Sequence, residues 1–179
     1  MNIGICGKMA SGKTYLAEFL QNAYDFKRMS LAAEVKNVAY HLFKMPKDQK
    51  DRRLLQQIGM KMREIKGSVW IDFLVEEAEG FYNDIVVDDV RFLNEVKTLK
   101  DAGWFLVKLD VADELQVERL KATYPDDWET HVSNRNDSSE SEVDTIPDEY
   151  FNLIITAENT KTPKILIEQM IRPYMPAPP

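Results

Sequence analysis

The chain has 179 residues, of which 44% are apolar, and its formal net charge is −7. This length suits one domain with its own core, and the acidic balance argues against general attraction to nucleic acid or to an anionic membrane. No apolar run approaches the length of a membrane span, and the short apolar start does not have the form of a signal peptide. The single cysteine, Cys6, excludes an internal disulfide. Its predicted place is a buried strand of a protein from a reducing, cytoplasmic compartment.

An apolar strand pattern at residues 2–6 leads directly into a glycine-rich loop and then into a helix expected at 13–24. The loop matches the complete pattern G-x-x-x-x-G-K-[ST], in which backbone N–H groups and a helix N-terminus surround phosphate oxygens. The residues of this expected ATP site are Gly7, Lys8, Met9, Ala10, Ser11, Gly12, Lys13 and Thr14. Lys13 would reach the β- and γ-phosphates, and the Thr14 hydroxyl would bind Mg²⁺. The loop therefore predicts ATP and Mg²⁺ as cofactors and leaves the reaction open.

The rest of the chain alternates between apolar runs typical of buried strands and segments with helical periodicity. Before the middle of the chain we expect a strand at 26–29 and helices at 31–44, 49–66 and 69–80. After it we expect strands at 85–87, 105–109 and 151–155, and helices at 93–102, 113–122 and 163–171. The segment 123–149 is polar and acidic, which is typical of a mobile loop or lid, and the tail Pro173–Pro179 is not expected to be helical. This alternation predicts an α/β fold with a parallel sheet covered by helices on both faces.

A second group of polar residues follows the apolar run 85–87, where parallel strands place their ligand-binding edge. Asp88 and Asp89 end that run, and we expect at least one of them to hold Mg²⁺. Arg91 follows at the same edge and is suited to clamp a phosphate with two hydrogen bonds. Glu95 lies one helical turn further on and would orient Arg91, although a plain surface ion pair explains the same spacing.

The helical stretch between the second and third expected strands contains basic residues among apolar ones, at Arg52, Arg53, Lys61 and Arg63. Trp70 and Asp72 follow closely. An arginine, an aromatic ring and a carboxylate together could clamp a phosphate, stack on a base and bind a sugar. The alternative is that the basic residues form the solvated face of a helix and that Trp70 belongs to the core.

Four segments together resemble the phage-type deoxynucleoside monophosphate kinases, a branch of the P-loop nucleotide kinases. They are the loop 7–14, SLAAEVK at 30–36, LQQIGMKMR at 55–63 with WID at 70–72, and VDDVRFLNE at 87–95. The family's aspartate falls on Asp89, so the resemblance makes Asp89, with Thr14, the implied metal ligand. It implies that Lys13, Arg63, Arg91 and Asp89 serve catalysis. The implied substrate-binding residues are Ser30, Lys36, Arg63, Trp70, Asp72, Arg91 and Glu95.

The resemblance becomes thinner after residue 110. The family's His-x-Ser-Glu pattern is split here between His131–Ser133 and Ser139–Glu140, and composition alone makes Arg119 and Arg135 the candidate lid arginines. The implied organisation is one P-loop kinase domain with a five-stranded parallel sheet. Its core would comprise residues 1–30, 83–122 and 150–171, with an acceptor-binding helical insertion at 31–82 and a lid at 123–149.

The family resemblance implies transfer of the ATP γ-phosphoryl group to a deoxynucleoside monophosphate, in the cytoplasm of the host if a phage encodes the chain. An acceptor phosphate needs no general base, which suits the lack of a visible histidine or carboxylate pair for that role. Three alternatives stay open: a kinase for a hydroxyl acceptor such as dephospho-coenzyme A, with Asp88 or Asp72 as base, a kinase for a modified base in DNA, and a non-kinase nucleotide switch. The expected partners are small nucleotides, with no membrane and no nucleic acid, and a homodimer is compatible with the chain.

Overall fold

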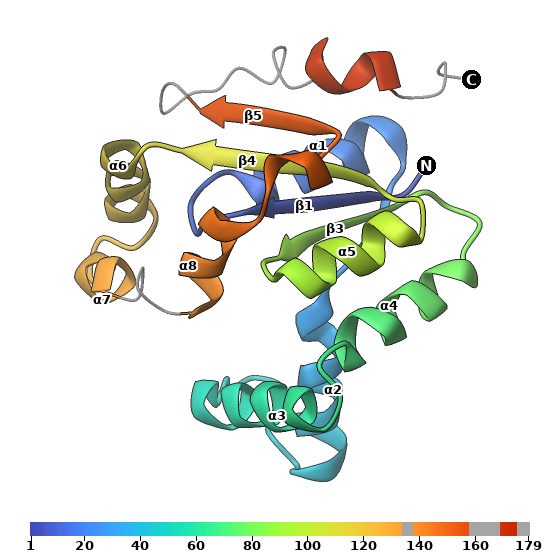
Figure 1. Cartoon of the computed structure of the whole chain (residues 1–179). Helices are drawn as coiled ribbons and strands as arrows, with labels where there is room; N and C mark the ends of the chain where they lie inside the picture. The colour runs from blue at the N-terminus through green and yellow to red at the C-terminus, as the bar shows by residue number, and fades with distance from the viewer. Residues whose placement is uncertain (134–137, 158–168, 175–179) are drawn as a thin grey trace.

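The computed structural model describes residues 1–133, 138–157 and 169–174, and its centre is a five-stranded sheet (Figure 1). The strands are β1 (Ile3–Gly7), β2 (Lys27–Met29), β3 (Ile85–Val90), β4 (Phe105–Val111) and β5 (Leu153–Ala157). They pair in parallel in the order β2-β3-β1-β4-β5. In the register, Ile3 of the central strand lies opposite Val86 on one side and Phe105 on the other. The predicted fold class is confirmed.

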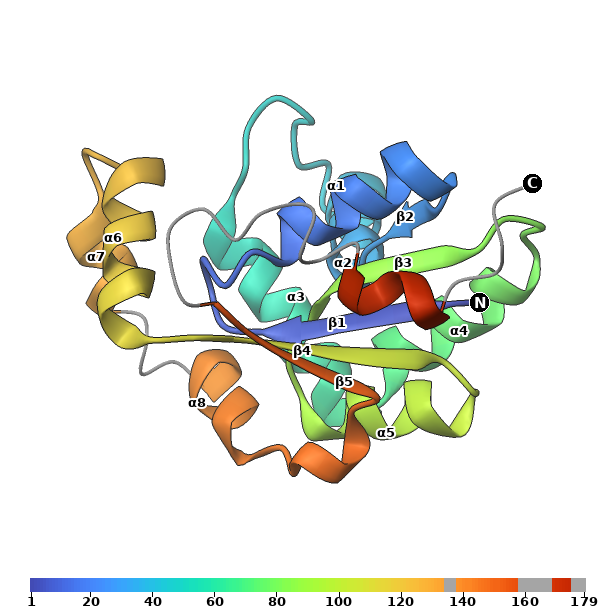
Figure 2. The ribbon, with the colours of Figure 1, turned by 90° about the horizontal axis from the view of Figure 1, so that it is seen from above.

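Helices connect the strands and cover both faces of the sheet (Figures 1 and 2). Those of the core are α1 (Lys13–Tyr24), α5 (Leu93–Asp101) and α6 (Asp113–Thr123). The insertion between β2 and β3 consists of α2 (Leu31–Leu42), α3 (Arg52–Ile65) and α4 (Val69–Glu79). The short elements near the end are α7 (Trp128–Ser133), α8 (Ser138–Thr145), η2 (Asp148–Tyr150) and η3 (Arg172–Tyr174).

The sheet separates two apolar cores, and consecutive residues of β3 face opposite sides. Val86 belongs to the core that contains Leu16 and Leu20 of α1. Val87 belongs to the other core, with Leu99 of α5 and Trp70 of the insertion. A central parallel strand needs apolar side chains on both faces, which explains the uninterrupted apolar run at its start.

The carboxyl ends of the strands lie at one edge of the sheet, on the left in Figure 1, where the elements of the candidate site meet. The loop 8–12 follows β1, the N-terminus of α2 follows β2, and Arg91 follows β3. The helices α6, α7 and α8 lie at the same edge (Figure 1).

The segment 123–149, which the sequence predicts to be a mobile loop or lid, contains the helices α7 and α8 and the start of η2. Its role as a lid stays a prediction. Val143 of α8 and Ile146, which follows it, are each 2% exposed and join the core that contains Val87. Tertiary packing has therefore stabilised helices that the polar composition disfavours.

Two further differences concern strand ends and the end of the chain. β3 and β4 run past residues 87 and 109. β3 continues to Val90, which pairs with Cys6, and β4 continues through Asp110, which pairs with Thr156. A helix was expected at 163–171. Residues 163–168 lie outside the described residues, and residues 169–171 are helical. The tail was expected to be non-helical, but Pro173 lies in η3.

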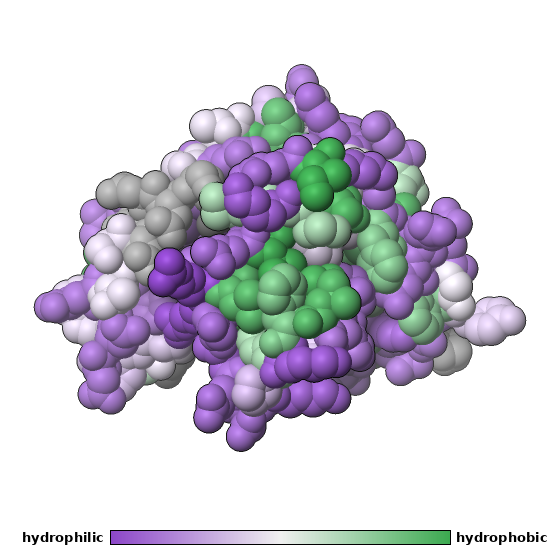
Figure 3. All heavy atoms as spheres, turned by 90° about the horizontal axis from the view of Figure 1, so that it is seen from below, coloured by the Kyte–Doolittle hydropathy of each residue, from purple (hydrophilic) through white to green (hydrophobic). Residues whose placement is uncertain are grey.

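No helix in the described part of the chain has both the length and the apolar character needed to cross a membrane. The underside of the molecule shows an apolar area bordered by hydrophilic side chains (Figure 3). Large apolar side chains exposed on the insertion and at its helix ends are Leu42, Phe43, Met60, Ile65 and Phe73. The homodimer stays a prediction.

Candidate active site

The loop between β1 and α1 needs glycine at both of its ends. A Cβ atom on Gly7 would lie 2.7 Å from the Leu109 carbonyl oxygen and 2.7 Å from Ser11 Oγ, so a side chain has no room there. Gly12 has a φ of +107°, which side-chain-bearing residues rarely adopt. Both glycines of the motif are thus required by the backbone path of the loop.

The N-terminus of α1 is open to an anion. Gly12 is its N-cap and provides no side-chain hydrogen bond to the first turn. The N–H groups of such a turn are unpaired within the helix, and the helix dipole favours negative charge beside them. The buried Ser11 hydroxyl also has no hydrogen-bond partner within the described residues. These features fit the phosphate groups that the sequence predicts for this loop.

Lys13 is folded back against its own loop. It is 8% exposed, and its Nζ donates to the carbonyl oxygens of Gly7 at 2.5 Å and Lys8 at 2.6 Å. Burial, together with the positive charge of Arg91, lowers the pKa of Lys13 to about 8, while Glu140 acts in the opposite direction. An incoming polyanion would therefore stabilise the charged form of a lysine that burial destabilises.

The carboxylate beside Thr14 belongs to Asp88. The Thr14 hydroxyl donates to Asp88 Oδ2 at 3.1 Å, and Arg28 of β2 binds both carboxylate oxygens at 2.8 and 2.5 Å. The sequence-based choice for the metal was Asp89, which the structure places elsewhere. Because successive residues of a strand point to opposite faces, only one of the two aspartates can face the loop.

Asp89 instead holds the start of α2. It accepts hydrogen bonds from Ser30 Oγ at 2.7 Å and from the N–H groups of Leu31 and Ala32 at 3.0 Å each. Ser30 is the N-cap of this helix. The predicted substrate residue Ser30 and the predicted metal ligand Asp89 thus lie together and fix the entry to the insertion.

Thr14 and Asp88 are compatible with Mg²⁺. Among residues 1–133, 138–157 and 169–174, no group of three or more His, Cys, Asp or Glu side chains surrounds a common metal position. Mg²⁺ in kinases takes only one or two protein ligands, together with phosphate oxygens and waters. A hydroxyl and a carboxylate next to the phosphate loop therefore fit this ion.

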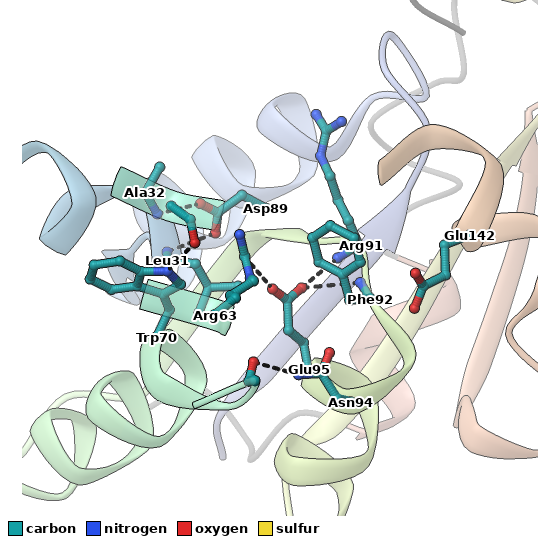
Figure 4. A network of polar contacts seen from close by, with 12 residues as sticks. Leu31, Ala32, Arg63, Trp70, Asp89, Arg91, Phe92, Asn94, Glu95 and Glu142 are labelled. Carbon is teal, nitrogen blue, oxygen red and sulfur yellow. Dashed lines mark hydrogen bonds and ion pairs between the residues drawn. The ribbon is translucent and has the colours of Figure 1, made fainter. Parts of the chain in front are cut away.

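Glu95 joins the insertion to the turn after β3 (Figure 4). It is 2% exposed, its Oε1 accepts from Arg63 Nη2 at 3.0 Å, and its Oε2 accepts from the N–H groups of Arg91 at 2.9 Å and Phe92 at 3.1 Å. Burial raises the pKa of Glu95, while these three donors oppose the shift. Arg63 also lies over the Phe92 ring, at 4.8 Å from its centroid. The predicted pairing of Glu95 with Arg91 runs through the Arg91 backbone, which leaves the guanidinium for other partners.

Three other residues that were predicted to bind the substrate are placed where the structure gives that role less support. Trp70 is 5% exposed and its indole N–H donates to the Gly59 carbonyl, so it belongs to the core, as the alternative interpretation had it. Asp72 binds Ser68 and Lys66, and these contacts lower its pKa. Lys36 lies on α2, half-buried, with no ion pair or hydrogen bond of its side chain to another described residue.

Of the two arginines predicted for the lid, only Arg119 can be placed. Arg119 lies on α6 and donates to the carbonyl oxygens of Ala10 at 3.1 Å and Ser11 at 3.0 Å, so it touches the phosphate loop directly. Gln116, one turn earlier, donates to the Met9 carbonyl at 2.8 Å. Arg135 lies outside the described residues.

Comparison with curated proteins finds a relative in Acanthamoeba polyphaga mimivirus named "Putative deoxynucleotide monophosphate kinase". It is 26% identical over 140 residues, which cover 60% of this chain and 72% of that protein. No family model matches the chain.

Among solved structures, shikimate kinase from Acinetobacter baumannii in complex with shikimate matches with a TM-score of 0.55 and 15% identity, over 97% of this chain and 92% of that one. An uncharacterized protein from Eubacterium ventriosum matches with a TM-score of 0.60 and 15% identity, over 97% and 98% of the two chains. The fold is that of the P-loop kinases. Together with the mimivirus relative, the comparisons indicate a phosphotransferase.

Two residues at the site of this P-loop kinase fold were missed in the sequence. Arg28 pairs with Asp88, and Glu140 of α8 contacts both Arg91 and the N–H of Met9. Arg28 gave no sequence signal, because an arginine in a short edge strand is usually solvated. Glu140 did belong to the split His-x-Ser-Glu pattern, but its separation from His131 concealed its role.

Proposed function

We propose that the chain is a deoxynucleoside monophosphate kinase, which transfers the γ-phosphoryl group of ATP to the 5′-phosphate of a deoxynucleoside monophosphate and gives a diphosphate and ADP. The fold and the mimivirus relative support a nucleotide or small-molecule kinase. The choice of acceptor rests on that relative, on the family resemblance and on the site.

The observation that carries the proposal is the presence of two groups of cationic side chains at one edge of the sheet. One is the phosphate loop with Lys13. The other is the arginine pair Arg63 and Arg91, which Glu95 links through the Arg63 side chain and the Arg91 backbone. Glu140 accepts hydrogen bonds from both the Arg91 guanidinium and the Met9 N–H of the loop, so Arg91 lies between the two groups, where it can serve a phosphate held by either. Two phosphorylated substrates repel each other, and cations on both sides offset that repulsion.

The charge distribution supports an anionic acceptor at the insertion. Residues 44–66 contain eight of the 23 lysines and arginines and only three of the 30 acidic residues. This segment is therefore positive in an acidic chain. Such a local potential draws an anionic substrate towards the site and increases its association rate.

The reaction itself asks for positioning more than for proton transfer. An acceptor phosphate is already a nucleophile near neutral pH, so Lys13 and the two arginines need only hold the two phosphates in line and neutralise the charge of the transition state. Mg²⁺, when bound by Thr14 and Asp88, supplies further charge neutralisation at the phosphates.

The carboxylates that a hydroxyl acceptor would need are poorly suited to act as bases. Asp88 is held on both oxygens by Arg28. Asp72 pairs with Lys66 and Ser68, which lower its pKa and make it a weaker base. A base must accept a proton from the hydroxyl, so both arrangements favour a phosphate acceptor over a hydroxyl acceptor.

The test is ADP release with Mg·ATP and each deoxynucleoside and ribonucleoside monophosphate in turn, with shikimate and dephospho-coenzyme A as hydroxyl acceptors. We expect ADP and the matching diphosphate in equal amounts with at least one deoxynucleoside monophosphate. ADP release independent of any acceptor, or phosphorylation of a hydroxyl acceptor alone, would refute the proposal.

A matched pair of α3 variants tests the acceptor side. Arg63→Ala should raise the KM for the monophosphate about 10- to 100-fold, the scale of one or two hydrogen bonds to a charged group, with the KM for ATP nearly unchanged. Lys61→Ala is the control, because Lys61 is exposed and pairs with Glu64. Circular dichroism must show that Arg63→Ala is folded, since the change removes a partner of buried Glu95. Equal effects of the two variants would remove Arg63 from the site.

A further inference from the structure

Glu140 places a carboxylate among the groups that the proposed function assigns to phosphate. Its side chain is 3% exposed. One oxygen accepts from Arg91 Nη1, and the other accepts from the loop N–H of Met9 at 2.7 Å. Its charge also acts on Lys13. The carboxylate thus occupies an arginine and a loop N–H that are both suited to bind a phosphate.

The helix that carries Glu140 is fixed at this position by independent contacts. Val143 and Ile146 are buried in the core, and Asp144 forms an ion pair with Lys8 of the loop at 2.7 Å. Two residues after Glu140, Glu142 accepts from the Leu93 N–H at 3.0 Å and so binds the start of α5. Two carboxylates of α8 thus meet the phosphate loop, and one of them is buried there.

A buried carboxylate needs charged or N–H partners, and a phosphate would need the same ones. We propose that Glu140 is an internal anion of the phosphate site: it binds Arg91 and the Met9 N–H in the nucleotide-free enzyme and competes with a phosphate group of ATP for them. The inference rests on the proposed function, because it takes the loop and Arg91 as phosphate-binding groups. When the triphosphate binds, Arg91 would exchange the carboxylate for a phosphate.

The competition predicts a direction of effect that a supporting role does not. If Glu140 only positioned Arg91, its neutralisation would weaken the binding of ATP. If it competes, neutralisation removes both a rival acceptor and a repelling charge, so ATP binds more tightly. The sign of the change in Kd therefore decides between the two roles.

The experiment measures the Kd of Mg·ATP by isothermal titration calorimetry, without any acceptor, for the wild type, Glu140→Gln and Glu142→Gln. We expect Glu140→Gln to bind ATP about tenfold more tightly, which corresponds to relief of one charged contact. Glu142→Gln is the matched control on the same helix and should stay within about twofold of the wild type. Weaker or unchanged binding by folded Glu140→Gln overturns the inference.

A second variant covers the case in which Glu140→Gln does not fold. Asp144 has a side chain that is 60% exposed, so Asp144→Asn should fold, and it removes the other α8 carboxylate from the loop. It should bind ATP about two- to threefold more tightly, because an exposed pair contributes less than a buried one. No gain in that variant, with Glu140→Gln unfolded, counts against the inference.

The binding assay tests the internal anion and the acceptor assay tests the proposed function, so either claim can fail without the other. If no monophosphate is phosphorylated but Glu140→Gln binds ATP more tightly, the acceptor assignment is wrong and the internal anion stands. If a deoxynucleoside monophosphate is phosphorylated and Glu140→Gln binds ATP more weakly, only the internal anion is wrong.

Discussion

At the phosphate loop, the groups expected to bind phosphate already have partners within the chain, whereas in the helical insertion several basic groups do not. Lys13 Nζ is bound by two loop carbonyls, and the Met9 N–H is bound by Glu140. In the insertion, Arg52 and Arg53 are exposed and make no ion pair with another residue of the described ranges. In the proposed function, ligand binding at the loop would exchange these partners, while Arg52 and Arg53 of the insertion would gain new ones.

This difference suggests where specificity lies. The loop is shaped by backbone constraints at Gly7 and Gly12 and would hold any triphosphate in much the same way. The proposed acceptor side is built from side chains such as Arg63, which α3 and Glu95 orient. Changes in the insertion should therefore alter which acceptor is used, and changes at the loop should alter turnover with every acceptor.

The largest expected effect follows from removing the loop cation. Lys13→Met should lower kcat about 100-fold or more with every acceptor, because it deletes a positioned charge at the transferring group. The KM for the monophosphate should stay within about twofold. Lys108→Met is the control: its ammonium lies on β4 and pairs with Asp148 and Asp110. Steady-state kinetics with folded Lys13→Met that retained a tenth of the wild-type kcat would contradict the assigned role.

The next effect separates the two neighbouring aspartates. Asp88→Asn should lower kcat about 30- to 100-fold and raise the Mg²⁺ concentration needed for tight ATP binding, since Asp88 is the carboxylate beside Thr14. Asp89→Asn should retain most of the turnover. It should lower the free energy of unfolding by about 1–3 kcal/mol, because three donors at the start of α2 lose a charged acceptor.

Calorimetric titration of Mg·ATP and thermal unfolding of both variants give the comparison. If Asp89→Asn lost turnover and tight Mg²⁺-dependent ATP binding while Asp88→Asn mainly lost stability, the family-based choice of Asp89 as metal ligand would be restored.

The two aspartates also show what the sequence could and could not predict. The parallel sheet and the phosphate loop were predictable, because apolar runs and glycine positions follow from local backbone requirements. The face on which Asp88 lies could not be read from the run VVDD, since strand register depends on neighbouring strands. The Arg91–Glu140 contact joins residues 49 positions apart, and only the packing of α8 brings them together.

Trp70 is a second case in which the sequence pattern could not decide the role of a residue. Its spacing from Arg63 and its neighbour Asp72 suited a base-binding site, but the same residue type at helical spacing also suits a core. Burial of Trp70 depends on α3 packing against α4, which supplies the Gly59 carbonyl for its indole N–H. Pattern alone does not distinguish these roles.

A smaller effect concerns the pH dependence of ATP binding at the loop. Burial holds the pKa of Lys13 at about 8 in the free protein, and bound phosphates would raise it, so the complex takes up a proton. The Kd for ATP should therefore be nearly constant below pH 8 and rise about tenfold per pH unit above it, until the pKa of the bound state is reached.

Calorimetry in two buffers with different ionisation enthalpies measures both the Kd and the proton uptake. Lys13→Arg keeps its charge through this range, so its Kd should not change between pH 8 and 9.5. A wild-type Kd that is flat to pH 9.5 would show that Lys13 does not titrate in this way.

The smallest expected effect tests whether the insertion uses Trp70 as a base platform. Trp70→Phe fills most of the buried space but cannot donate to the Gly59 carbonyl, so the free energy of unfolding should fall by about 1–2 kcal/mol. Because the indole is buried, the KM for the monophosphate should stay within about twofold, and any quenching of tryptophan fluorescence by the monophosphate should persist in the variant. Quenching that disappears in Trp70→Phe, with unchanged stability, would instead place a base against Trp70 and require the insertion to open when the acceptor binds.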